Sequence, residues 1–148
     1  MIRKLIRHPN PLLIAQSDAV DLKSDQDLLT DLLDTFADYH GTALGLAAVQ
    51  IGRLKRAAVV VLHGKPALIV NPFLKWRSSI YVSAEEGCLS IPWIKLKVSR
   101  ANAVKLAYVN RDGTAIVCTL HGPDARVVQH ELDHMDGITL DQHRRKKA

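Results

Sequence analysis

The chain has 148 residues, so we expect one domain spanning residues 1–148. Apolar residues make up 47% and charged residues 24%, which is the balance of a globular protein and not of a disordered one. The longest apolar runs, such as Ala57–Leu62, are too short to cross a bilayer, so we expect no membrane partner. The first residues lack a secretory layout and the only cysteines are Cys88 and Cys118, which favours a reducing, cytoplasmic location.

The formal charge of +5 is concentrated at the C-terminal end. Twenty Lys and Arg residues stand against 15 Asp and Glu residues, and four of those cations lie at positions 144–147. This basic tail, residues 143–148, has two interpretations: contact with ribosomal RNA through phosphates, or a solvated segment. No aromatic residues are interleaved with the cations, so we expect no sequence-specific binding of nucleic acid.

A first helix is predicted after an irregular segment, residues 1–23, in which prolines at positions 9 and 11 oppose helix formation. Ser24 and Asp27 form an S-x-x-D start signal, and Gly41 is a natural stop. Apolar residues at spacings of one, three and four predict a buried stripe on this helix. The stripe consists of Leu28, Leu29, Leu32, Leu33 and Phe36.

The middle of the chain is composed of short runs that are rich in Val and Ile or alternate in polarity, as is typical of β-strands. The predicted strands are residues 57–62, 67–70, 94–98, 103–109 and 114–120. Asp112 and Gly113 predict a hairpin turn between the last two. Gly122 and Pro123 then favour the start of a second helix, which should run to about Met135 and stop at Gly137. Helix, antiparallel strands and helix together predict an α+β fold.

The strongest chemical signal lies on the second predicted helix, in the sequence His130-Glu131-Leu132-Asp133-His134. Histidines at positions i and i+4 project from one face of a helix, so both imidazoles can reach one divalent metal. Glu131 lies beside them and can act as a general base toward water and later as a proton donor. The H-E-x-x-H pattern carries this mechanism. The alternative is a solvated helix face with coincidental histidines.

Two histidines need a third protein ligand to complete a metal site. One extension of the motif places a third histidine further along, but Leu140 occupies that position and His143 comes three residues late. Cys88 is the alternative, because a thiolate is a strong ligand for a borderline-soft metal and Gly87 before it permits close backbone approach. A buried free cysteine is the competing interpretation for Cys88, and it is the one we prefer for Cys118.

A third segment, residues 43–50, combines small side chains with one polar residue, Gln50. Small residues in series indicate close backbone approach, and a buried glutamine needs a hydrogen-bond partner. Its amide can donate to an oxyanion that develops beside a metal. A structural Gly/Ala-rich turn capped by a glutamine is the other interpretation.

Taken together, these segments resemble the peptide deformylase family, whose motifs G-x-G-x-A-A-x-Q, E-G-C-L-S and Q-H-E-x-D-H occur in this order. The matching positions are residues 43–50, 86–90 and 129–134. Further similarity at residues 6–12, 71–72, 91–92 and 125–126 extends the resemblance over nearly the whole chain. We therefore expect antiparallel strands packed around a central metal-binding helix that carries the H-E-x-x-H motif, with an N-terminal helix.

The resemblance implies a hydrolase that removes the formyl group from the N-terminal formyl-methionine of nascent polypeptides and releases formate. It implies one divalent metal, typically ferrous iron, with nickel, cobalt or zinc as alternatives. The implied metal ligands are Cys88, His130 and His134, and the implied catalytic residues are Glu131, Gln50 and Leu89. Glu131 is the general base and then the proton donor, while Gln50 and the backbone N–H of Leu89 stabilise the oxyanion. The implied substrate-binding residues are Gly45, Gly87 and Lys95.

Two departures from the family pattern touch substrate binding and leave the metal chemistry intact. Ala43 replaces the first glycine of its motif, and Lys95 stands where the family often has an arginine, which changes a planar fork into a point charge. They motivate one alternative function, an amidase for another N-acyl substrate. The other alternative is a catalytically idle, ribosome-tethered metal-binding protein, against which the presence of Glu131 argues. Arg100 is expected to pair with Glu86.

Overall fold

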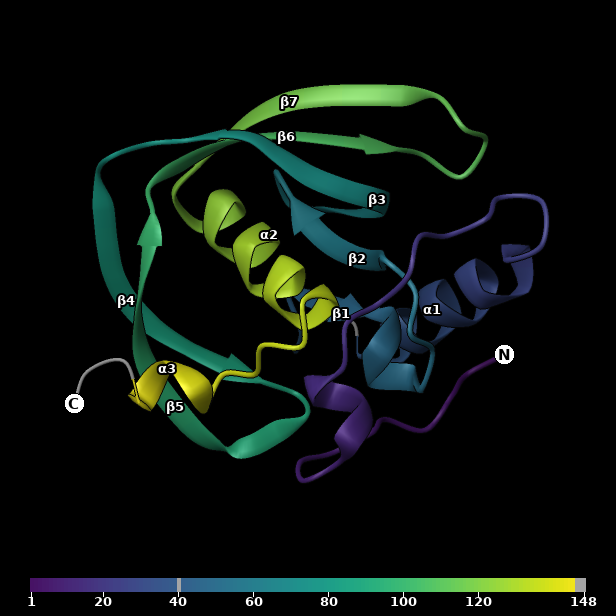
Figure 1. Ribbon diagram of the computed structural model, residues 1–148, viewed down its shortest axis with the longest axis horizontal. Helices are drawn as coiled ribbons and strands as arrows, with labels where there is room; N and C mark the ends of the chain where they lie inside the picture. The colour runs from purple at the N-terminus through teal and green to yellow at the C-terminus, as the bar shows by residue number, and fades with distance from the viewer. Residues whose placement is uncertain (40, 146–148) are drawn as a thin grey trace.

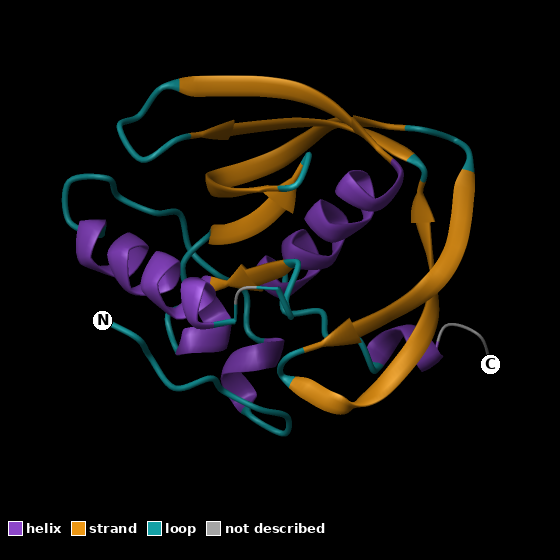
Figure 2. Cartoon of the chain, turned by 180° about the vertical axis from the view of Figure 1, so that it is seen from behind, coloured by secondary structure: helices purple, strands orange, loops and turns teal. Residues whose placement is uncertain are grey.

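The computed structural model describes residues 1–39 and 41–145, in which antiparallel strands surround a helix (Figures 1 and 2). The helices are α1 (Gln26–Asp38), α2 (Gly122–Met135) and α3 (Gln142–Arg145), with the short 3-10 helices η1 (Pro11–Ile14) and η2 (Ala48–Ile51). The strands are β1 (Gly45–Ala47), β2 (Ala57–Leu62), β3 (Lys65–Arg77), β4 (Tyr81–Cys88), β5 (Ile91–Ala101), β6 (Ala103–Val109) and β7 (Ala115–His121).

The strands form two separate antiparallel sheets. One sheet has the order β1-β2-β3-β6-β7, and β4 pairs only with β5 in the other. In Figure 1 the larger sheet curves over α2, and the β4–β5 hairpin closes the side of that helix. The predicted α+β fold with a central motif-bearing helix and an N-terminal helix is therefore confirmed. Within the described residues, none of the helices is long and apolar enough to span a membrane.

Helix α2 lies at the centre of the fold, and local residues determine both of its ends and its apolar face. It begins at Gly122 with Pro123 in the first turn, as predicted, and a left-handed Gly137 (φ 75°) follows its end. A Cβ at Gly137 would lie 2.6 Å from the Ile14 carbonyl oxygen, so glycine is required there sterically as well. Val128 of α2 is fully buried and packs in the same core cluster as residues of β2, β6 and β7. The apolar side of α2 thus fixes which way its polar side faces.

Helix α1 lies on the outer side of β1 and β2 and carries the predicted apolar stripe. Leu28, Leu29 and Leu32 are fully buried, and they pack in a second core cluster with Val59 of β2. The predicted cap at Ser24 is wrong by one residue, because Asp25 is the N-cap and its carboxylate accepts a hydrogen bond from the backbone of the preceding turn (2.8 Å). The start signal therefore located the helix but not the capping side chain.

Of the seven strands in the described residues, five were predicted and β1 and β4 were missed. The predicted ranges 67–70 and 94–98 cover only part of β3 and β5. The bounds of β2 and β6 agree with the sequence, and the turn at Asp112 and Gly113 joins β6 to β7 as predicted. β4 was missed because its mostly exposed residues show no alternation of apolar and polar side chains. β1 was missed because it has only three residues in a small-residue segment. Cys118 on β7 is a free cysteine that packs against the main core cluster, as preferred from the sequence, but it is half-buried and not fully buried.

Candidate metal centre

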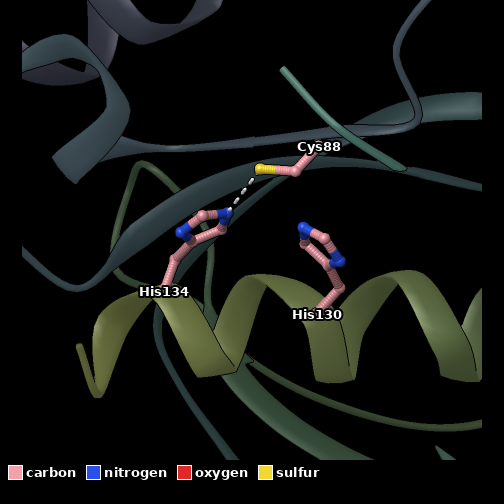
Figure 3. Close-up of side chains that lie close together, drawn as sticks. All are labelled: Cys88, His130 and His134. Atoms are coloured by element: carbon pink, nitrogen blue, oxygen red, sulfur yellow. Dashed lines mark hydrogen bonds between the residues drawn. The ribbon is translucent and has the colours of Figure 1, made fainter. Parts of the chain in front are cut away.

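The end of β4 brings Cys88 against the polar face of α2, where His130 and His134 lie one turn apart (Figure 3). Cys88 Sγ lies 3.4 Å from His134 Nε2, and one ligand atom from each of the three residues lies within 4.8 Å of the others. Sulfur and nitrogen ligands of one tetrahedral metal lie roughly 3.5 Å apart when the bonds are ~2.3 and ~2.05 Å long. The donor set and its spacing therefore fit a single divalent ion.

Glu86, the residue that sequence reasoning named only as a partner of Arg100, fixes the orientation of His130. Its Oε1 lies 2.9 Å from His130 Nδ1. Because an ionised carboxylate can only accept, Nδ1 carries the hydrogen and Nε2 is the nitrogen left for a metal. Burial lowers the pKa of His130, but its hydrogen bonds to Cys88 and Glu86 outweigh this and raise that pKa to about 10, so a metal would displace a proton from Nε2. Arg100 donates two hydrogen bonds of 2.9 Å to Glu86, which confirms the expected pair. Arg126 Nη1 donates a further one of 2.6 Å to Glu86.

Burial and hydrogen bonding shift the acidity of these groups in different directions. Burial raises the pKa of Glu86, but the hydrogen bonds from Arg100 and His130 outweigh it and hold that pKa far below its ordinary value. Burial lowers the pKa of His134 well below its ordinary value, so this imidazole is neutral and its lone pair is available to a metal. Burial also raises the pKa of Glu131 to about 7. Glu131 can therefore accept and release a proton near neutral pH.

Glu131 lies directly against the backbone of β1. Its side chain is buried, with 3% of the residue exposed, and its Oε1 has no hydrogen-bond partner among the described residues. A Cβ built on Gly45 would lie 2.5 Å from Glu131 Oε2 and 2.9 Å from its Cδ, which is closer than real contacts allow. The absence of a side chain at Gly45 is therefore what lets the carboxylate occupy this position. The family resemblance implied a role for Gly45 toward substrate, and nothing in the sequence signalled this contact with Glu131.

Gln50 is held rigidly at the floor of the site. Its Oε1 accepts a hydrogen bond of 2.9 Å from the backbone N–H of Ala47, and its Nε2 donates one of 3.1 Å to Ser90 Oγ. The same Nε2 lies 3.8 Å from Cys88 Sγ, so the amide points toward the candidate metal site. Ser90 is fully buried and donates in turn to the Ile6 carbonyl oxygen at 2.8 Å. Ser90 is the last residue of the E-G-C-L-S motif, but its hydrogen bond to Gln50 was not predicted from the sequence.

A cleft of about 440 Å³ opens onto this centre between β1 and the β4–β5 hairpin. Most of the residues that the sequence singled out line it: Gly45, Gln50, Gly87, Cys88, Leu89, Lys95, His130 and Glu131. His134 lies behind them and is 1% exposed. A Cβ at Gly87 would meet nothing within 4 Å, so this position faces open space in the cleft. Ala43 also lines the cleft, and its backbone is outside the left-handed region, so alanine is unstrained there.

The arrangement combines a set of metal ligands, a buried carboxylate with a pKa near neutrality and a fixed amide donor, all at one end of a cleft. Fold and site together define a metal-dependent hydrolase of the H-E-x-x-H class.

Comparison with known proteins identifies the family within that class. The sequence matches the profile of polypeptide deformylase over residues 2–148. Peptide deformylase 1 of Bacillus subtilis is 40% identical over 141 residues, which are 93% of this chain and 86% of the relative. The crystal structure of peptide deformylase from Thermotoga maritima superposes with a TM-score of 0.89 at 29% identity, covering 97% of both chains. The Met-Ala-Ser-bound class I type b peptide deformylase from Acinetobacter baumannii gives a TM-score of 0.88 at 27% identity, with 97% and 98% covered.

The chain therefore belongs to the polypeptide deformylase family, and its activity is that of a peptide deformylase, a hydrolase.

Proposed function

We propose that this chain hydrolyses the formyl amide of N-terminal formyl-methionine on nascent polypeptides and releases formate, with one divalent metal held by Cys88, His130 and His134. The observation that carries the proposal is the convergence of three ligand atoms within 4.8 Å of one another beside the buried Glu131. The bound metal would supply Lewis acidity, which makes water a nucleophile at neutral pH. The remaining chemistry belongs to side chains and backbone groups of this chain.

Glu131 is the proposed proton carrier. With a pKa of about 7 it accepts the proton of the attacking water at Oε1 or Oε2 and then delivers it to the departing amine nitrogen. Gln50 Nε2 and the backbone N–H of Leu89 are the proposed donors to the oxyanion that forms on the formyl oxygen. The anchoring of Gln50 Oε1 by the backbone of Ala47 supports this role, because a fixed donor costs no reorganisation during the reaction.

Ferrous iron is the metal we propose, with zinc, nickel and cobalt as alternatives. One thiolate and two imidazoles suit all of these borderline ions better than the hard ions Mg²⁺ and Ca²⁺. The donor set thus supports a transition metal at this site, and metal analysis of the protein as isolated decides among the four.

The peptide is proposed to lie along the cleft between Gly45 on β1 and Gly87 on β4, with Lys95 close to its backbone. Support comes from the cleft lining and from the Acinetobacter baumannii relative, which is bound to Met-Ala-Ser. We further propose that residues 1–148 act as one catalytic domain in the cytoplasm and that the basic tail, residues 143–148, contacts the ribosome. Arg144 of that tail is exposed, whereas Lys146 and Lys147 lie outside the described residues.

Formate release from formyl-Met-Ala-Ser tests the proposal. Protein prepared without oxygen and loaded with ferrous iron or nickel is compared with its Glu131→Gln variant. We expect metal-dependent release that falls by at least about 10²-fold in the variant at equal metal content. Turnover of acetyl-Met-Ala-Ser as fast as the formyl peptide would redirect the proposal to another N-acyl substrate. Bound metal without hydrolysis of either peptide would refute it in favour of an idle site.

A further inference from the structure

The segment after α2 returns toward the candidate metal centre at His143, the histidine that stands three residues beyond the position required by the extended motif. His143 Nε2 lies 2.9 Å from Asp133 Oδ2, and its side chain is 13% exposed. The segment is held by Leu140, which is buried against Ile91 and Val98 of β5, so α3 lies beside this strand (Figure 1). His143 therefore contacts Asp133 and is not one of the proposed metal ligands, and Leu140 anchors the segment that carries it.

A continuous chain of hydrogen bonds connects His143 to a proposed metal ligand. Asp133 Oδ2, which accepts from His143, also accepts from Arg100 Nη1 at 2.6 Å. The other edge of the Arg100 guanidinium makes its two hydrogen bonds of 2.9 Å with Glu86. Glu86 then accepts from His130 Nδ1. Arg100 and Glu86 have side chains that are only 6% exposed, so the central part of the chain is shielded from water.

The guanidinium is the rigid part of this chain. The guanidinium is planar, so a side chain that hydrogen-bonds to one of its edges also determines the orientation of the other edge. Asp133 holds the Nη1 end, and with 23% of its side chain exposed it is the least enclosed member of the interior chain. Without a second donor, its carboxylate would be free to rotate and exchange Arg100 for water. His143 supplies that donor.

We propose that His143 is a positioning residue for the metal centre, acting through Asp133, Arg100 and Glu86 on the orientation of His130. The inference rests on the proposed metal-binding roles of Cys88, His130 and His134. Groups that orient a metal-ligating imidazole directly are worth about 10- to 100-fold in metal affinity or activity. Since His143 acts three residues further out than Glu86, the residue that orients His130 directly, we expect an effect of about three- to tenfold.

Zinc release tests this inference without any peptide. Zinc-loaded protein is mixed with excess chromogenic chelator, and the rate of release is compared among variants. We expect His143→Ala to release zinc about three- to tenfold faster, and His143→Gln to restore the native rate because its amide retains a donor at similar reach. Arg144→Ala, an exposed neighbour on α3, is the matched control and should behave as native. With formyl-Met-Ala-Ser, His143→Ala should lower kcat and leave KM unchanged.

Several outcomes would overturn the inference. A native release rate in His143→Ala, or equal acceleration in His143→Gln or Arg144→Ala, would leave only a general docking role for the segment. Asp133→Asn keeps the shape of that side chain and weakens both of its contacts, so it covers the case in which His143→Ala does not fold. A native release rate in Asp133→Asn overturns the inference as well. Because zinc release is measured without peptide, the release rates stand whether or not the formyl peptide proves to be the substrate.

Discussion

The contact between Gly45 and Glu131 predicts a large catalytic cost for a single methyl group. In Gly45→Ala the new Cβ would stand 2.5 Å from Glu131 Oε2, whereas ordinary contact begins at 3.4 Å, so the carboxylate must retreat by about 0.9 Å. Glu131 is 3% exposed and lies on a packed helix, so the movement has to occur in its own side chain. A misplacement of ~1 Å in a reacting group can cost ~10²-fold in rate. We expect a fall in kcat of about 100-fold.

The assay separates this effect from folding and from peptide binding. Formate release from formyl-Met-Ala-Ser gives kcat and KM, and elemental analysis gives the metal content, which should stay native because no ligand touches Gly45. Gly87→Ala is the matched comparison: its Cβ would enter open cleft space, so it should raise KM and have little effect on kcat. The reasoning is refuted if Gly45→Ala keeps kcat within about threefold of native, or if its loss appears in KM alone.

Three further changes have defined outcomes. Arg100→Lys keeps the charge but loses the fork that joins Glu86 to Asp133, so zinc affinity measured by chelator competition should fall about tenfold; an unchanged affinity would contradict the role of that fork. A backbone N–H holds the pKa of Asp25 below its ordinary value of 3.8, so ionised Asp25 stabilises the fold above about pH 4 and this stabilisation is lost as pH falls through the lowered pKa. Asp25→Asn should therefore lower Tm at neutral pH, and the difference should close as pH falls through the lowered pKa of Asp25, whereas a constant difference would argue against it. The iron-loaded protein should lose activity in air as Cys88 oxidises while the zinc-loaded protein does not, and equal decay of both forms would exclude this cause.

The parts that sequence could predict are those set by local spacing. Histidines at i and i+4 on α2 share a face in any helix, so His130 and His134 could be paired before the fold was known. The start and end of α2 were likewise given by Pro123 and Gly137. Cys88 could be proposed as the third ligand only as one of two interpretations, because its approach to α2 depends on the path of β4, which has no apolar alternation.

The parts that sequence could not predict are contacts between distant segments. Gly45 and Glu131 are far apart in the chain and belong to different elements, so no periodicity relates them. The same holds for the path from His143 to Glu86, in which each residue is hydrogen-bonded to a neighbour from another element. Such contacts form only when α2, β4 and β5 pack together, so the propensities of single residues cannot predict them.

The separation of the two sheets would give a metal bound at the candidate site a mechanical role. The β4–β5 hairpin shares no strand pairing with the larger sheet in the described chain, yet it forms one wall of the cleft. Cys88 sits on that hairpin while both histidines sit on α2, so a shared ion cross-links the wall to the body of the molecule. Such a cross-link would add to the hydrogen bonds that His130 and Arg126 of α2 already make to Glu86 on the hairpin. The ion that would activate water would then also brace one wall of the cleft that the peptide is proposed to enter.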